Sequence, residues 1–276
     1  MGISINHVLI VIAANLIFLI VFSRYKQSLH FFILLIYSIT ASATIAGIFL
    51  HLDFLYILGL SLTFLAVLHL LYGKTCLISS VSPNASYMML VVLAYFVSFQ
   101  IQQNFVGGQD AYALYLPYTR YLCSHREFPS SLLFPDGPGW VHIMAYPPML
   151  VSLGSLLFIS FSVASEAIAS MVPSVFFIAF LLVLFSWYEK GNGRPWVLCI
   201  LLLVSPFFIE RSSWYTQESL VLFSCTFLLY MLYMYEKEKQ PEYITYAILA
   251  SSLGLLAKYN GLFFTLFLAF FILLRR

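Results

Sequence analysis

The sequence predicts an all-α membrane protein, a polytopic bundle of about nine spanning helices with further helices lying at the outer membrane face. Of its 276 residues, 62% are hydrophobic and 9% are charged, and the mean hydropathy is +0.95. Soluble domains instead carry about a quarter charged residues. Apolar runs of helix length recur along the whole chain, and the polar residues lie in the connections between them. Any chemistry is therefore expected in those connections.

Ten apolar runs are visible, and each is close to the length of a helix. They cover residues 5–23, 30–50, 54–72, 86–103, 147–163, 167–188, 196–209, 217–235, 243–257 and 261–274. The first run is not a secretory signal, because Arg24 and Lys26 follow it and no cation precedes it. The positive-inside rule then places the N-terminus outside.

The remaining loop charges test this assignment. Cytoplasmic anchors are expected at Arg24, Lys26, Lys74, Lys190, Arg194, Lys237, Lys239, Arg275 and Arg276. An odd number of crossings must separate the outer loop 104–146 from Lys190, so one of the runs 147–163 and 167–188 does not span. The run 147–163 is short, rich in serine and opens with two prolines, and we expect it at the outer face. The alternative is two full crossings and an inverted second half.

Several function classes can be set aside. The formal net charge is only +2 and the cations are dispersed, so nucleic acid is not an expected partner. The cysteines are far apart and have no metal-ligand spacing, so we interpret them as small buried hydrophobic residues. They are Cys76, Cys123, Cys199 and Cys225. No nucleotide-binding, hydrolase or zinc-protease motif occurs.

The long loop 104–146 is rich in tyrosine and proline and is expected to be folded and functional. Asp110 follows two glycines and opens the amphipathic stretch 111–122, in which tyrosines recur every third residue. A carboxylate there would meet the head group of a lipid-borne substrate. The alternative is a helix cap beside an aromatic membrane belt.

Two further ionisable residues lie at the ends of later apolar runs. Glu218 begins the run 217–235, either as a partner of the helix dipole or as a site residue. Lys258 lies on the side where cations are disfavoured, so it requires an anionic partner, either Glu218 or a ligand phosphate. His125, His142 and Asp136 are either solvated or ligands of a divalent metal ion, which remains a candidate cofactor.

Five segments occur in an order and spacing that resemble a known family. They are GGQDAYALYLPYTRYLCSHREFP at 107–129, AYPPMLVSLGSLLF at 145–158, WYEKGNGRPW at 187–196, SPFFIERSSWYTQESLVLFSCTFLLYMLY at 205–233 and LASSLGLLAKYNGLFF at 249–264. This pattern resembles the GT-C class of membrane glycosyltransferases. The most similar branch contains dolichyl-phosphate-mannose protein mannosyltransferases and bacterial aminoarabinose transferases of lipid A.

The resemblance implies roles for individual residues. Asp110 matches the proposed catalytic base and Glu218 the second acid, at which the family more often has aspartate. Lys258 matches a family lysine, and Tyr146 replaces the lysine that often precedes the proline pair, where it is a candidate substrate contact. Phosphate binding is then expected from the outer cations, which are Arg120, Arg126, Arg211 and Lys258.

The resemblance also implies a domain plan. Residues 1–85 form an extra three-helix membrane segment, and residues 86–276 form the GT-C-like core, shortened at its C-terminus. A shortened core is expected to need a partner polypeptide, to lack activity or to be a fragment.

The implied reaction moves a sugar from a polyprenyl-phosphate donor to a lipid, glycan or protein acceptor at the outer face, with inversion. Two rivals stay open. One is a non-catalytic membrane subunit that binds lipid-linked sugar. The other is a transporter or flippase, which would place ionisable residues near the bilayer midplane, whereas this chain keeps them in loops and at helix ends.

Overall fold

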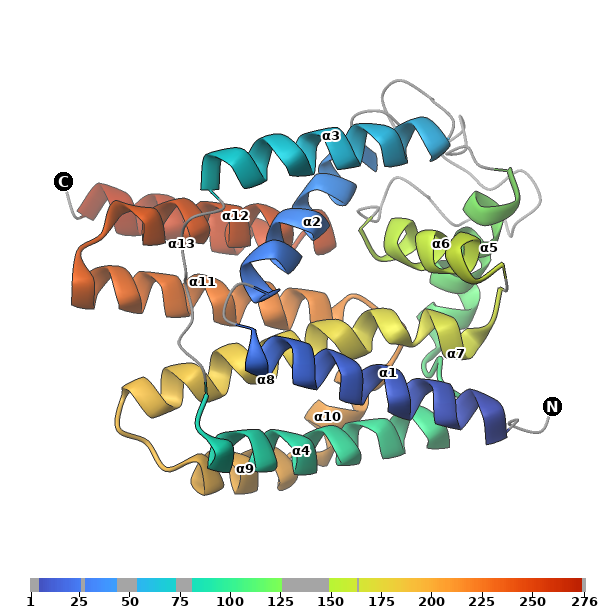
Figure 1. The fold of residues 1–276 in the computed structure, drawn as a ribbon, viewed down its shortest axis with the longest axis horizontal. Coiled ribbons are helices and arrows are strands. Elements are labelled where there is room, and N and C mark those ends of the chain that lie inside the picture. The colour runs from blue at the N-terminus through green and yellow to red at the C-terminus, as the bar shows by residue number, and fades with distance from the viewer. Residues whose placement is uncertain are drawn as a thin grey trace.

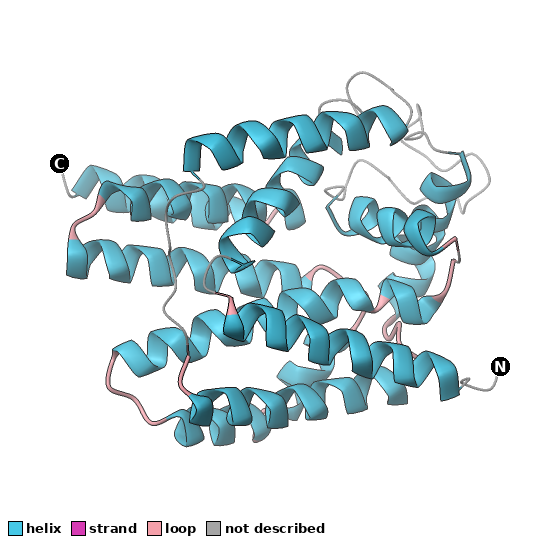
Figure 2. Ribbon diagram, in the orientation of Figure 1, coloured by secondary structure: helices cyan, strands magenta, loops and turns pink. Residues whose placement is uncertain are grey.

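The computed structural model describes residues 5–25, 28–43, 54–72, 81–125, 149–162 and 164–274. All regular structure in these ranges is helical, which confirms the all-α class (Figure 2). The elements are α1 (Ile5–Arg24), α2 (Ser28–Ser42), α3 (Phe54–Tyr72), α4 (Pro83–Gln102), the π-helical turn η2 (Ala111–Tyr115), α5 (Leu116–His125), α6 (Met149–Phe161), α7 (Glu166–Ala169), α8 (Met171–Lys190), α9 (Pro195–Leu203), α10 (Pro206–Ser213), α11 (Glu218–Glu238), α12 (Pro241–Ala257) and α13 (Gly261–Leu274).

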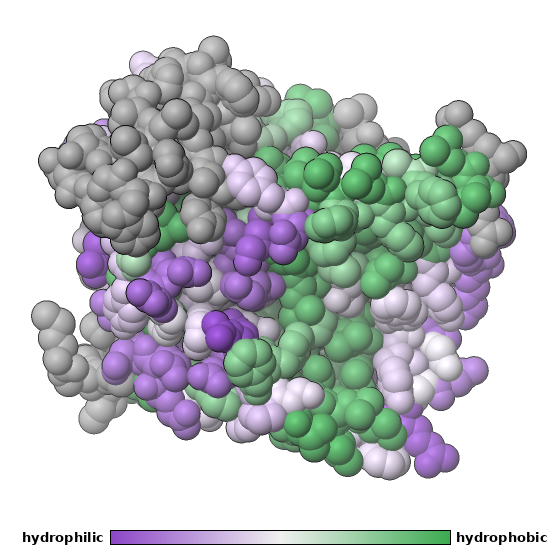
Figure 3. Space-filling model, turned by 180° about the vertical axis from the view of Figure 1, so that it is seen from behind, coloured by the Kyte–Doolittle hydropathy of each residue, from purple (hydrophilic) through white to green (hydrophobic). Residues whose placement is uncertain are grey.

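The axes of the long helices are roughly aligned, so the bundle has two ends (Figure 1). These ends hold different elements and different charged residues. One end holds α5, α6, α7 and the start of α11, and we call it the site end. The other holds the α8–α9 and α11–α12 turns, and we call it the basic end because its cations are Lys190, Arg194, Lys237 and Lys239. In space-filling view an apolar band lies between polar groups on both sides (Figure 3).

Three described helical stretches are long and apolar enough to cross a membrane: Pro83–Gln102, Glu166–Lys190 and Glu218–Glu238. Two bent pairs bring the number to five if each pair forms one span. They are Val8–Arg24 with Leu29–Ser42, bent by 118°, and Pro195–Leu203 with Pro206–Ser213, bent by 79°. The structure is therefore compatible with an integral membrane protein, and the number of about nine spans stays a prediction.

One hydrophobic core joins all the described helices except α3, and it includes α1 and α2. Leu65 and Leu68 of α3 form a second, small cluster with Leu34 of α2. Phe96 of α4 stacks on Phe177 of α8 with 4.1 Å between ring centroids. Lipid tails are as apolar as these rings, so close packing and buried hydrogen bonds hold such helices together. One example is the buried Gln100 amide, which donates to the Ser170 carbonyl and the Ser174 hydroxyl, each at 3.0 Å.

The N-terminal helices are joined to the rest by polar contacts as well. The buried His30 of α2 forms a 2.6 Å hydrogen bond with the hydroxyl of Tyr246 in α12. The expected boundary between residues 85 and 86 is not tested by this packing and stays a prediction.

Two apolar runs form shorter elements than their sequences suggest. The run 196–209 divides into α9 and α10, because Pro206 has no N–H with which to continue a helix. The run 147–163 yields α6, whose 13 residues extend for about 20 Å, less than the roughly 30 Å of a hydrocarbon core.

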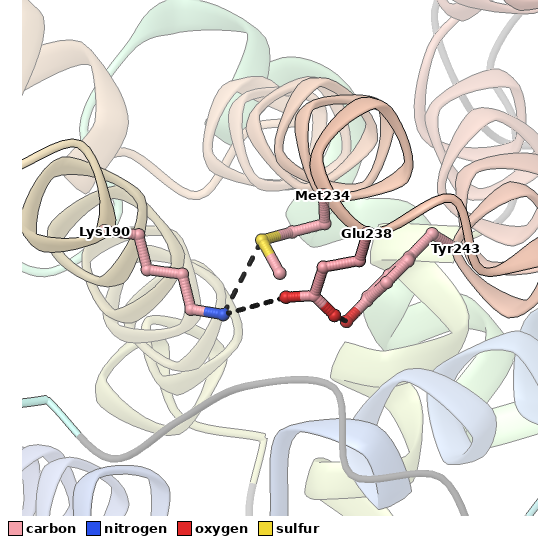
Figure 4. Close-up of polar contacts among 4 residues, drawn as sticks. All are labelled: Lys190, Met234, Glu238 and Tyr243. Atoms are coloured by element: carbon pink, nitrogen blue, oxygen red, sulfur yellow. Dashed lines mark hydrogen bonds and ion pairs between the residues drawn. The ribbon is translucent and has the colours of Figure 1, made fainter.

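The basic end is connected by a cluster across three helices (Figure 4). Lys190 of α8 lies 3.7 Å from a carboxylate oxygen of Glu238 in α11 and also contacts the sulfur of Met234. The Tyr243 hydroxyl of α12 donates to the other Glu238 oxygen at 2.7 Å. Next to Lys190, the Glu189 carboxylate accepts hydrogen bonds from the Ser82 hydroxyl and N–H. These contacts fix the ends of α4, α8, α11 and α12.

Candidate functional site

Two loops that lie about a hundred positions apart in the sequence meet at the site end. Gly107 and Gly108 both have positive φ, +56° and +74°, and lie against the indole of Trp214. A Cβ at either position would approach that ring to 2.4–2.5 Å, so only glycine fits. The Tyr215 N–H donates to the Val106 carbonyl at 2.7 Å. The glycine turn before Asp110 is therefore fixed to the segment before α11.

Tyr215 extends this connection into the core. Its side chain is fully buried, and its hydroxyl lies 2.9 Å from the hydroxyl of Thr119 on α5 and 3.4 Å from the carbonyl oxygen of Leu150 on α6. The Ser155 hydroxyl of α6 donates to the Thr119 carbonyl at 3.1 Å. Burial raises the pKa of the Tyr215 phenol well above its usual value, so the hydroxyl stays protonated and able to donate.

Asp110 stands at the start of the helix formed by η2 and α5. Its side chain is exposed and makes no capping hydrogen bond to the helix. The cap alternative is therefore not supported by its geometry, although a carboxylate at a helix N-terminus is still favoured by the dipole. In the expected aromatic belt, Tyr115 and Tyr118 are buried against the core, while Tyr112 is exposed.

Glu218 and Lys258 are brought together, as expected if the lysine takes a protein partner. The Lys258 ammonium, just after α12, lies 3.4 Å from the Glu218 carboxylate at the first residue of α11. The two side chains are 38% and 43% exposed. Exposed pairs of this kind contribute about 0–1 kcal/mol, so this pair contributes little to stability and can exchange partners with a charged ligand.

Two of the other candidate cations also have partners. The Arg211 guanidinium lies 4.2 Å from the centroid of the Trp214 ring and 4.9 Å from that of Phe207. The Arg120 guanidinium lies 3.7 Å from the Glu166 carboxylate at the start of α7. The pKa of the nearby Tyr112 phenol is raised, first by burial and then by the negative charge of Glu166.

Polar groups without protein partners gather near the start of α11. In the described part of the chain, the Ser219 and Thr216 hydroxyls and the Trp214 indole N–H are buried and accept or donate no hydrogen bond. The hydroxyl of Ser152 on α6 is in the same state. Such groups are costly to bury unless something satisfies them.

Some expected residues are not covered. Arg126 and Tyr146 lie outside the described residues, as do His142, Asp136 and Cys76. His125 stacks on Tyr121 with 4.1 Å between ring centroids. Among the residues that the structure describes, no group of three His, Cys, Asp or Glu side chains could hold a metal ion. Of the described cysteines, Cys199 is buried, and Cys123 and Cys225 are half-buried.

Sequence reasoning missed the residues that join the two loops. Trp214 and Tyr215 belong to a quoted segment, but nothing in the spacing indicates that they contact Gly108 and Thr119. Glu166 appears in the sequence only as an isolated acid after an apolar run. The one sequence signal for this contact is the aromatic pair Trp214 and Tyr215, which closely follows Arg211 in a polar segment.

Compared with known proteins, this chain matches no family model, no curated protein and no solved structure.

Proposed function

We propose that this protein is an inverting membrane glycosyltransferase that takes its sugar from a polyprenyl-phosphate donor. The observation that carries the proposal is the joining of the two loops at the site end. Gly107 and Gly108 pack on Trp214, and Trp214 in turn holds Arg211. The acid Asp110, after the glycine turn, and the cation Arg211, in α10, are thereby held on a common scaffold, as transfer from a phosphate leaving group requires.

In the proposed reaction Asp110 takes the proton from an acceptor hydroxyl. The acceptor oxygen attacks the anomeric carbon from the face opposite the phosphate, and the bond from that carbon to the phosphate oxygen breaks. The lipid phosphate leaves as an anion, so it requires positive charge and no general acid. The exposed, uncapped carboxylate of Asp110 is free to meet an acceptor.

The cations divide into two groups in this proposal. Arg211 of α10 and Lys258, which follows α12 and contacts Glu218, would bind the leaving phosphate. Glu218 holds Lys258 at 3.4 Å in the resting protein and would orient the acceptor when the lysine turns to the phosphate. The unpartnered hydroxyls of Thr216 and Ser219 supply hydrogen bonds to sugar or phosphate oxygens. Arg120 would contact the same phosphate from the side of α5.

The test is transfer of radiolabelled sugar from polyprenyl-phosphate donors to membrane acceptors, with wild-type and Asp110→Asn protein compared in the same membranes. We expect Asp110→Asn to lower the rate at least about 100-fold, because the proton acceptor is lost while the shape is kept. Glu210→Gln is the matched control, since Glu210 is an acid of α10, next to Arg211, that carries no role here.

Wild-type turnover by Asp110→Asn would refute the base assignment. No transfer by either protein, with both still folded, would favour the non-catalytic subunit that binds lipid-linked sugar.

A further inference from the structure

An apolar cavity of about 410 Å³ lies between α1, α2, α6 and α8. Its walls are made of aliphatic and aromatic side chains from all four helices. Those that carry the argument are Ile17, Phe18, Phe31, Leu156, Val175 and Phe176. Ligand sites in proteins occupy about 300–1,000 Å³, and apolar cavities stay dry and take apolar ligands. The cavity is therefore large enough to hold part of a hydrocarbon chain.

The cavity opens to the surface of the bundle. Ile17 and Phe31 are 59% and 45% exposed at its rim, whereas Phe32 and Phe176 are buried at its base. These rim helices form a bent pair that is apolar enough to lie in the membrane. A hydrocarbon chain could thus enter sideways from the bilayer, with no need to pass through water.

One end of the cavity lies near charge. Met171 and Val172 line it and begin α8, directly after α7. The first residue of α7 is Glu166, which pairs with Arg120 at 3.7 Å. The exposed pair is weak, so a phosphate that arrives beside the cavity can compete for the arginine. The cavity thus extends from the site end, where a phosphate can be held, into the apolar part of the bundle.

We propose that this cavity binds a stretch of the polyprenyl chain of the donor, with the phosphate of that lipid near Arg120. The inference rests on the proposed function and names the place of its donor lipid. A polyprenyl phosphate carries one chain on its phosphate, which fits one cavity beside one cation, whereas a bilayer phospholipid carries two. The proposal also gives α1 and α2 a part in donor binding.

The experiment uses a polyprenyl phosphate with a photoreactive diazirine in its chain, bound to the purified full-length protein in detergent micelles. After illumination, mass spectrometry locates the crosslinked peptides. We expect them in α1, α2, α6 and α8, at cavity-lining residues. Excess unlabelled polyprenyl phosphate should remove the crosslinks, and phosphatidylglycerol at the same concentration should not.

Two variants fill the cavity, Val175→Phe and Leu156→Trp, and each should lower crosslinking at least about tenfold. Ala94→Phe is the control, since it adds an aromatic ring to a smaller groove between α1 and α4 instead. Thermal unfolding of each variant shows whether it is folded. Equal competition by phosphatidylglycerol would mean that the cavity takes any membrane lipid without preference, and this would overturn the proposal. Unchanged crosslinking in both folded cavity variants would also overturn it.

The outcome is separable from the transferase proposal, because Asp110→Asn should crosslink as well as the wild type. Sugar transfer without crosslinks in the cavity would remove this inference and leave the function. Crosslinks that unlabelled polyprenyl phosphate removes, without any sugar transfer, would keep the lipid-binding cavity and remove the transferase function.

Discussion

Gly108 is held in a backbone conformation that other residues rarely adopt, with φ of +74° and the Trp214 ring against its Cα. We expect Gly108→Ala to lower the free energy of unfolding by about 1–3 kcal/mol, since the methyl group adds both backbone strain and a clash. The measurement is thermal unfolding in detergent, followed by circular dichroism. The variant should also lose sugar transfer, because the Asp110 loop loses its support.

The matched control for this change is Gly59→Ala in α3. A Cβ at Gly59 would meet no atom within 4 Å, and alanine is favoured over glycine in a helix by up to about 1 kcal/mol. Gly59→Ala should therefore be as stable as the wild type or slightly more stable. If Gly108→Ala behaves in the same way, contact with Trp214 does not fix the loops.

At the level of single residues, charge was easier to predict from sequence than shape. Lys258 is predicted on the outer side of the membrane, where cations are disfavoured, so an anionic partner was expected. Glu218 was one of the two candidates, and the structure pairs it with Lys258. The contact between Tyr215 and Thr119 links positions 96 residues apart. A buried tyrosine hydroxyl needs a partner, but local spacing does not say which of many hydroxyls provides it.

Among the elements, α6 is linked to α5 through Tyr215 near its start, and α7, which follows α6, also pairs with α5. Near its start, the Leu150 carbonyl shares the Tyr215 hydroxyl with Thr119. Beyond its end, Glu166 at the start of α7 pairs with Arg120, which follows Thr119 in α5. Together with its length of about 20 Å, this supports the expectation that α6 does not cross the membrane.

We therefore expect the two flanks of α6 to be accessible from the same side of the membrane. Ser124→Cys at the end of α5 and Phe161→Cys at the end of α6, both exposed positions, should react with a membrane-impermeant maleimide under the same conditions. The native cysteines are first changed to serine, and that parent protein is the control. Labelling of the two positions from opposite sides would mean that α6 spans.

Helix existence was predictable because apolar runs need internal hydrogen bonds in lipid. The positions at which the helices end were harder to predict. The sequence Ser205–Pro206 is a common helix boundary, but the apolar residues on both sides of it suggested one continuous run. The 79° bend between α9 and α10 is the result.

For the whole molecule, the distribution of charge indicates an orientation. The basic end carries Lys190, Arg194, Lys237 and Lys239, so from the positive-inside rule we expect this end in the cytoplasm and the site end outside. In the cysteine-free parent, Asn192→Cys and Gln240→Cys should react with the impermeant maleimide only after the membrane is permeabilised. Ser124→Cys should react before permeabilisation. The opposite result would invert the orientation and place Asp110 inside the cell.

The order of the chain has a consequence for its synthesis. Gln100 finds its partners in Ser170 and Ser174, which lie 70 and 74 positions later. At about 5–20 residues per second, a ribosome needs several seconds to make that length. During that interval the amide of α4 has no native partner in the bilayer, so α4 must wait beside the insertion machinery or exchange hydrogen bonds with water until α8 emerges. The native hydrogen bonds of Gln100 therefore form only after α8 has been made.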